Sequence, residues 1–207
     1  MRRIRVGHGI ALAVLALAFS ATAALAGGYS VGVTGGLGAP MSEFKDAFSS
    51  GWTGAGMADY DMNPLWGVGV DLGYHTWKAS DAQIAFELVG QPLGTTLDDK
   101  LAALQYGLHV TVTPPVLGPV RPYAQVGASA YNLKETTSSN LAALSGDFSK
   151  SLFGWNAGAG VNFAMLPTLS FGVDGHYHDV NSKKDFGSNA TWFTVNGRLT
   201  FHIPLAK

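Results

Sequence analysis

Four segments of this chain alternate apolar and polar residues at every second position, and this periodicity constrains the fold more than any other feature of the sequence. They span residues 66–75, 104–113, 169–180 and 193–203. In the last segment, Phe193, Val195 and Leu199 lie on one face and Thr194 and Asn196 on the other. A period of two is typical of a β-strand that has one apolar and one polar face. The pattern therefore predicts four such strands.

Four further segments follow the same pattern, with Gly and Ala in place of larger apolar residues. They cover residues 29–37, 52–62, 120–133 and 152–165. Short turns at 63–65, 114–119 and 166–168 alternate with long polar stretches at 39–50, 79–100, 135–150 and 181–190. This arrangement predicts an all-β fold, an antiparallel up-and-down transmembrane β-barrel of about eight strands, with short periplasmic turns and long extracellular loops. Both ends of the mature chain would then lie at the short-turn end.

The N-terminal residues have the pattern of an export signal. Arg2, Arg3 and Arg5 precede an uncharged stretch that is rich in Ala and Leu and ends with Ala24 and Ala26. Signal peptidase accepts small residues at those two positions. A membrane anchor is the alternative, but the apolar core is short for a bilayer of about 30 Å. We therefore expect residues 1–26 to be removed, which leaves 27–207 as one outer-membrane β-barrel domain.

Composition supports a membrane location and excludes several functions. Charged residues make up 13% of the chain, against about 25% in a typical soluble domain, yet no apolar run after the leader is long enough for a transmembrane helix. Removing the three leader arginines from the 13 basic residues leaves 10 against 14 acidic ones, a net charge of −4. This charge argues against a nucleic-acid partner. The absence of cysteine excludes a disulfide scaffold, a thiolate metal site and a cysteine nucleophile.

Aromatic residues of the apolar face gather at both ends of the predicted strands. Those near the short-turn end are Tyr29, Tyr60, Trp66, Phe163, Phe171 and Phe201, and those near the loop end are Tyr74, Phe153, Trp155, Tyr177 and Phe193. Two such aromatic girdles are typical of a lipid-facing wall. A soluble barrel that holds a ligand, as in lipocalins, would turn the same face inward. We favour the membrane barrel because bulky aromatics would crowd an eight-stranded interior.

Two segments carry a resemblance to a known family. Residues 121–128, with the sequence RPYAQVGA, resemble a strand of the opacity-type outer-membrane β-barrel proteins, and residues 171–180, FGVDGHYHDV, are similar to a later strand of that family. The resemblance implies a small eight-stranded barrel like those of OmpA and OmpX, in contact with outer-membrane lipid. It also implies insertion by the barrel-assembly machinery, which commonly recognises a C-terminal aromatic residue; Phe201 and its strand are the candidates here.

Charged residues on the polar face are expected to form a structural network in the lumen. They are Asp59, Asp61, Asp71, Arg121, Asp174, His176 and Arg198. Charges in a narrow lumen must pair or meet water, and a conducting, charge-lined pathway is the alternative. If Phe171 lies opposite Phe201, then Asp174 lies opposite Arg198, which predicts a direct ion pair between the last two strands.

No catalytic, metal or cofactor site is expected. His176 and His178 have a spacing that a metal could use, but the sequence supplies no third ligand, so we interpret them as lumen packing. Lipid A deacylases of similar size carry a His-x-Ser pair on a late strand, and here His178 stands at the serine position.

The sequence favours a non-enzymatic integral outer-membrane protein with a side-chain-filled lumen. Such a protein would contribute to envelope integrity or bind a surface ligand through its extracellular loops. The alternatives are a small-solute channel or porin and, after that, an enzyme that modifies envelope lipid. The second long loop contains the apolar run 84–89, which would either bind a partner or pack over the mouth of the barrel.

Overall fold

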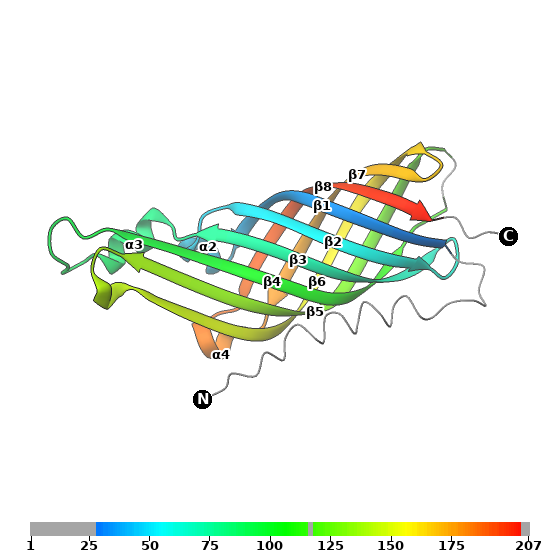
Figure 1. Ribbon diagram of the computed structural model, residues 1–207. Coiled ribbons are helices and arrows are strands. Elements are labelled where there is room, and N and C mark those ends of the chain that lie inside the picture. Colours follow the sequence, from blue (N-terminus) through cyan, green and yellow to red (C-terminus); the bar gives the residue numbers. More distant parts are fainter. Residues whose placement is uncertain (1–27, 116–117, 204–207) are drawn as a thin grey trace, which may run out of the picture.

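A computed structural model describes residues 28–115 and 118–203 and shows a closed barrel of eight strands, each paired with its neighbours along the chain (Figure 1). Every pairing is antiparallel, and β1 pairs with β8 to close the sheet. The strands are β1 (Gly28–Met41), β2 (Gly51–Asp61), β3 (Trp66–Lys78), β4 (Leu97–Val112), β5 (Val120–Ser139), β6 (Gly146–Leu166), β7 (Leu169–Val180) and β8 (Ala190–Ile203). The predicted antiparallel eight-stranded barrel is therefore confirmed.

The expected leader, residues 1–26, lies outside the described residues. Its removal and the new N-terminus at Gly27 stay a prediction, which N-terminal sequencing of the membrane-extracted protein would test.

The two ends of the barrel differ. Three short connections, after β2, β4 and β6, lie at one end together with the first and last described residues, and we call this the short-turn end (Figure 1). The opposite, loop end carries the helices α2 (Phe44–Ala47), α3 (Asp81–Glu87) and α4 (Lys183–Phe186) and the 3-10 turn η1 (Ala142–Leu144). Across residues 28–115 and 118–203, no helix is long and apolar enough to span a membrane.

The hairpin of β5 and β6 is much longer than the periodicity predicts. We expected a loop over residues 135–150, but β5 has 20 residues and β6 has 21, and they pair as far as Thr137 opposite Gly146. Apart from Phe148, this part of the hairpin is polar on both faces, so it lacks the apolar alternation that marks a half-buried strand. Backbone pairing and β-branched threonines continue the strand where the apolar pattern stops.

The structure places all eleven residues of the predicted girdles on the outward face. Tyr29 packs on Tyr60 at the short-turn end, with ring centroids 4.9 Å apart, and Trp155 packs on Tyr177 toward the loop end, at 5.5 Å. Trp52, which was not among the predicted girdle residues, joins the loop-end group and contacts Tyr74, with ring centroids 5.4 Å apart. The apolar face therefore points away from the barrel axis, and the polar face lines the lumen.

The lumen nevertheless contains large aromatic side chains, contrary to the crowding argument. Trp77, Tyr131 and Trp192 are fully buried inside the loop half of the barrel, where Phe44 of α2 packs on them. Small residues on facing strands provide the space. A Cβ at Gly38, for example, would lie 3.3 Å from the indole nitrogen of Trp77, tighter than an ordinary contact. We call Phe44, Trp77, Tyr131 and Trp192 the aromatic plug.

The predicted register of β7 and β8 is wrong by two residues. Phe171 lies opposite Leu199 and not Phe201, and Asp174 lies opposite Asn196 and not Arg198. A shift of two preserves which face each residue occupies but changes its partners. Because a nine-residue connection containing α4 joins these strands, no tight turn sets their register, and closure of the whole sheet does so instead.

Candidate functional site

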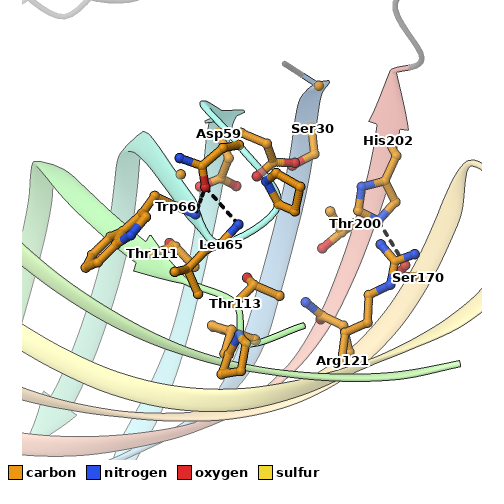
Figure 2. A pocket seen from close by; sticks show the side chains of 18 of the residues that line it. Ser30, Asp59, Leu65, Trp66, Thr111, Thr113, Arg121, Ser170, Thr200 and His202 are labelled. Atoms are coloured by element: carbon orange, nitrogen blue, oxygen red, sulfur yellow. Dashed lines mark hydrogen bonds between the residues drawn. The ribbon is translucent and has the colours of Figure 1, made fainter. Parts of the chain in front are cut away.

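A cavity of about 500 Å³ opens at the short-turn end of the lumen (Figure 2). We call it the vestibule. Its rim includes the β2–β3 turn, where the side-chain oxygen of Asn63 accepts hydrogen bonds from the backbone nitrogens of Leu65 and Trp66, both at 2.9 Å. Asp61, Arg121 and other polar residues line its walls. A solute can enter the lumen here from the short-turn end.

A layer of paired charges forms the floor of the vestibule. Arg198 lies 3.4 Å from Asp59 and donates a hydrogen bond to the hydroxyl of Tyr123 at 3.0 Å. Tyr123 in turn donates to Asp174 at 3.0 Å, and Asn196 donates to the other oxygen of that carboxylate at 2.9 Å. The predicted direct ion pair between Asp174 and Arg198 is therefore wrong, because the tyrosine hydroxyl stands between them.

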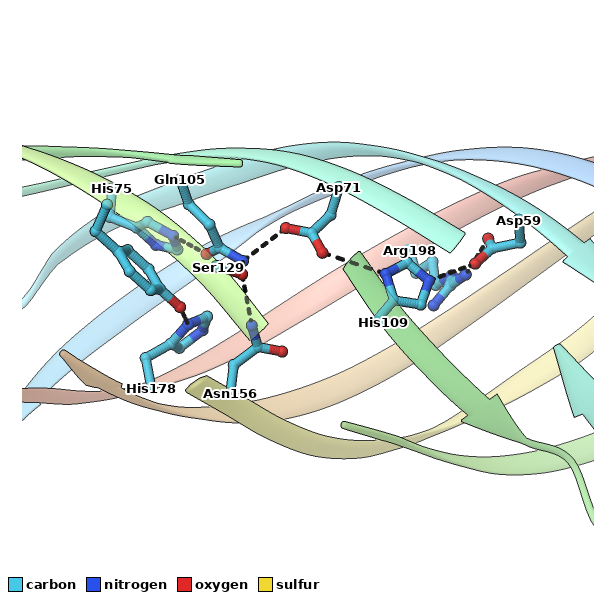
Figure 3. Close-up of polar contacts among 10 residues, drawn as sticks. Asp59, Asp71, His75, Gln105, His109, Ser129, Asn156, His178 and Arg198 are labelled. Carbon is cyan, nitrogen blue, oxygen red and sulfur yellow. Dashed lines mark hydrogen bonds and ion pairs between the residues drawn. The ribbon is translucent and has the colours of Figure 1, made fainter. Parts of the chain in front are cut away.

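His109 bridges two carboxylates above this floor (Figure 3). Its Nε2 lies 2.6 Å from Asp59 and its Nδ1 lies 3.2 Å from Asp71, and its side chain is fully buried. Ionised carboxylates only accept hydrogen bonds, so an imidazole between two of them must donate from both nitrogens. The arrangement fits an imidazolium, which together with Arg198 balances the charges of Asp59 and Asp71.

Neutral polar groups continue the network toward the loop end. Gln105 donates to Asp71 at 2.7 Å, and its carbonyl lies 3.0 Å from Nε2 of His75. The other nitrogen of His75 meets the Thr53 hydroxyl at 2.8 Å. Ser129 accepts from Gln105 at 3.2 Å, as Figure 3 shows. Each of these buried groups has a partner, which is how a polar core avoids the cost of desolvation.

The network ends at the aromatic plug. His178 contacts the Tyr131 hydroxyl at 3.1 Å and stacks on Trp192, with ring centroids 5.0 Å apart and planes at 9°. Trp192 meets Trp77 edge to face at 4.9 Å. From the floor of the vestibule to α2, the lumen carries a series of contacting polar and then aromatic side chains.

The structure brings together five of the seven residues predicted for the network. Arg198 pairs directly with Asp59, Asp71 and Asp174 are joined to them through His109 and Tyr123, and His176 lies 3.6 Å from Asp174. The remaining two, Asp61 and Arg121, line the vestibule and lie outside the connected network. The intermediates His109, Gln105, Tyr123 and Asn196 were not predicted from the sequence, although the alternation places all four on the polar face. Periodicity reveals a face, but it does not say which neutral residues connect the charges.

The chemistry available to these groups is limited. Over the described ranges, no group of three His, Asp or Glu side chains is arranged to hold a metal. Ser170 and His202 are 2.9 Å apart at the vestibule, a pair that could start a nucleophilic site. In the described part of the chain no carboxylate hydrogen-bonds to His202, so the third group that orients a catalytic base is missing.

Comparison with protein families matches residues 10–201 to the outer membrane protein beta-barrel domain. Comparison with curated proteins gives no match.

Among solved structures, a major outer membrane protein from Thermus thermophilus aligns with a TM-score of 0.54 at 16% identity, covering 86% of this chain and 100% of the other. Neisserial surface protein A aligns with a TM-score of 0.50 at 16% identity, covering 86% and 97%. The attachment invasion locus protein Ail of Yersinia pestis, in complex with the heparin analogue sucrose octasulfate, aligns with a TM-score of 0.50 at 15% identity, also covering 86% and 97%. At these identities the alignments show a common fold.

Proposed function

Because this chain belongs to the outer membrane protein β-barrel domain family, we propose that it is a non-enzymatic outer-membrane protein that acts through its extracellular end. It either interacts with a surface ligand or supports envelope integrity. The barrel holds the chain in the lipid, and the loop end presents the interacting groups.

The filled lumen is the observation that carries this proposal. A porin needs a continuous aqueous path, whereas here the charged layer of Arg198, Asp59 and His109 is followed by the buried aromatic plug. Moving an ion through would require breaking buried charge pairs and displacing Trp77 and Trp192. These features favour an anchor over a channel.

The loop end has features of a contact surface. In the second loop Phe86 and Val89 of the apolar run 84–89 are 75% and 76% exposed, and Leu93 beyond the run is 106% exposed. Ile84 and Leu88 of the run are half-buried, and Phe44 of α2 packs at the mouth. Singly exposed apolar residues are common on proteins, but three close together in one loop suggest a binding surface.

The charge at this end favours one kind of ligand over another. Among the side chains described there, seven are lysines, Lys45, Lys78, Lys100, Lys134, Lys150, Lys183 and Lys184, and nine are acidic, Glu43, Asp46, Asp81, Glu87, Asp98, Asp99, Glu135, Asp147 and Asp179. Their net charge is negative. A sulfated polyanion such as the one bound to Ail would be repelled overall, so an apolar or cationic surface suits this chain better.

Single-channel recording in planar bilayers tests the filled lumen. We expect no discrete conductance steps from the refolded protein. Regular voltage-stable openings in the wild-type barrel would instead establish the channel alternative.

A loop variant tests the surface role. Phe86→Ser, Val89→Ser and Leu93→Ser together should reduce attachment of producing cells to a hydrophobic or amine-coated surface, with unchanged barrel content in the outer membrane. The matched control replaces the lipid-facing Val33, 59% exposed, with Leu. If attachment and detergent resistance are the same in wild type, loop variant and gene deletion, the proposed role is wrong.

A further inference from the structure

Among the residues that the structure describes, two opposite charges in the vestibule have no direct partner. Arg121, at the start of β5, and Asp61, at the end of β2, both line it. Among the described residues, neither makes a hydrogen bond or an ion pair, although each acts on the other electrostatically. Arg198 and Asp59, which form the floor, are fully paired. The chain therefore satisfies its deep charges and leaves one cation and one carboxylate available at the entrance.

These two groups project from different walls of the cavity. β2 and β5 are three strands apart around the closed sheet, and Figure 2 shows Arg121 on the wall away from the β2–β3 turn. A single ion can satisfy only one of them. A solute with a cation and an anion at its two ends can meet both.

Other groups of the vestibule suit the same kind of solute. Part of the rim is apolar, with Leu65 and Pro114. A cavity of about 500 Å³ is within the range of pockets for small molecules, and it exceeds the needs of a water or a single ion.

We propose that the vestibule binds a small zwitterionic amino compound, a free amino acid or a short peptide, with its carboxylate at Arg121 and its ammonium at Asp61. Entry is from the short-turn, periplasmic side, because the charged layer closes the other side. Guanidinium and carboxylate groups give charge-assisted hydrogen bonds, which are the stronger kind, and the apolar part of the rim contacts the side chain of the solute. This site is at the opposite end from the loops and does not depend on their proposed role.

Calorimetric titration of the refolded protein in phospholipid nanodiscs tests the site. The ligands are alanine, alanyl-alanine, N-acetylalanine, which lacks the ammonium, and alaninamide, which lacks the carboxylate. We expect saturable binding of the first two, and roughly tenfold weaker binding of each blocked analogue, the loss typical of one charged hydrogen bond. Whichever of alanine and alanyl-alanine binds more tightly shows whether the site takes a free amino acid or a peptide.

Variants assign each end of the ligand. Arg121→Gln should reduce the affinity for the zwitterion to that for alaninamide and leave the affinity for alaninamide unchanged. Arg121→Lys should restore part of the lost affinity. Asp61→Asn should bring the zwitterion to the level of N-acetylalanine. Lys134→Gln and Asp147→Asn, an exposed pair at the loop end, make the same charge changes away from the cavity and should have no effect.

Three results would overturn the proposal. They are no saturable binding of either zwitterion by a correctly folded barrel, equal affinity for the blocked analogues, or equal losses in the loop-end controls. Folding of each variant is verified beforehand by circular dichroism and by heat-dependent migration on gels.

Discussion

The contact between Arg198 and Asp59 offers a direct test of the lumen and of the strand register. The perturbation is a double-mutant cycle with Arg198→Gln and Asp59→Asn. The two groups are 3.4 Å apart and their side chains are only 7% and 10% exposed. Removing one partner of a buried pair typically costs about 3–5 kcal/mol of unfolding free energy, and we expect each single variant to lose about that much.

The coupling follows from the geometry. Two unit charges 3.4 Å apart attract by about 5 kcal/mol at an effective dielectric constant of about 20. The coupling is smaller than this, because Asp59 keeps His109 at 2.6 Å when Arg198 is lost. Contacting groups show coupling energies of about 0.5–3 kcal/mol, and we expect about 2–3 kcal/mol here. Arg198 and Asp174, which meet only through Tyr123, should couple by less than about 1 kcal/mol.

Equilibrium urea unfolding in phospholipid vesicles, followed by tryptophan fluorescence, measures these energies. Both cycles are repeated with Tyr123→Phe, which should abolish the remaining coupling between Arg198 and Asp174. The reasoning is refuted if Arg198 couples more strongly to Asp174 than to Asp59, because that result would restore the register that pairs Phe171 with Phe201. Additive effects of Arg198→Gln and Asp59→Asn would show that their contact does not stabilise the barrel.

Three further predictions concern the outer wall, the lumen and the loop end. Leu72→Arg, at mid-strand on the outward face, should cost about 2–4 kcal/mol in vesicle unfolding, and tolerance of the arginine would contradict a lipid-facing wall. Gly69→Ala should destabilise the barrel in the same assay, because the new Cβ would lie 2.5 Å from a carboxylate oxygen of Asp59. Gly56→Ala is the control and should be neutral, because a Cβ at Gly56 meets open space. Equal effects of the two substitutions would count against a packed lumen. Burial and the nearby carboxylate of Asp99 raise the pKa of Glu135 to about 7, so the folded hairpin beyond the girdle holds this proton more tightly than the unfolded chain does. The stabilisation from protonated Glu135 is complete below the ordinary pKa of 4.5 and is lost as the pH rises to about 7. Hydrogen exchange of the hairpin should show this loss of stability. If a Glu135→Gln variant has the same pH dependence, Glu135 is not its origin.

Part of the lumen could be predicted from the chain alone. Alternation placed Asp59, Asp71, Asp174 and Arg198 on the inner face, and the structure joins all four. The same alternation also placed His109 inside, but nothing in its sequence neighbourhood indicates that two carboxylates from β2 and β3 meet its ring. Such contacts join strands far apart in the sequence.

The long hairpin and the aromatic plug show why other features escaped prediction. β5 and β6 continue beyond the point where their faces differ in polarity, so the signal that predicts a strand ends before the strand does. Trp77 and Trp192 occur at inward positions of strands whose apolar residues otherwise face outward. The lumen has room for these two tryptophans because neighbouring strands place glycine and other small residues opposite them, and only the folded structure shows which residues lie opposite.

The sequence by itself determined the number of strands, their direction and the face of each side chain, because a period of two is a local property of an extended chain. The tertiary structure alone decided which residues became partners. Closure of the barrel sets the stagger of all eight strands together, and a shift of two residues leaves every face unchanged while it moves Arg198 from Asp174 to Asp59 and Tyr123. The same closure positions Asp61 and Arg121 at one entrance without pairing them, and this arrangement leaves the vestibule able to bind a solute.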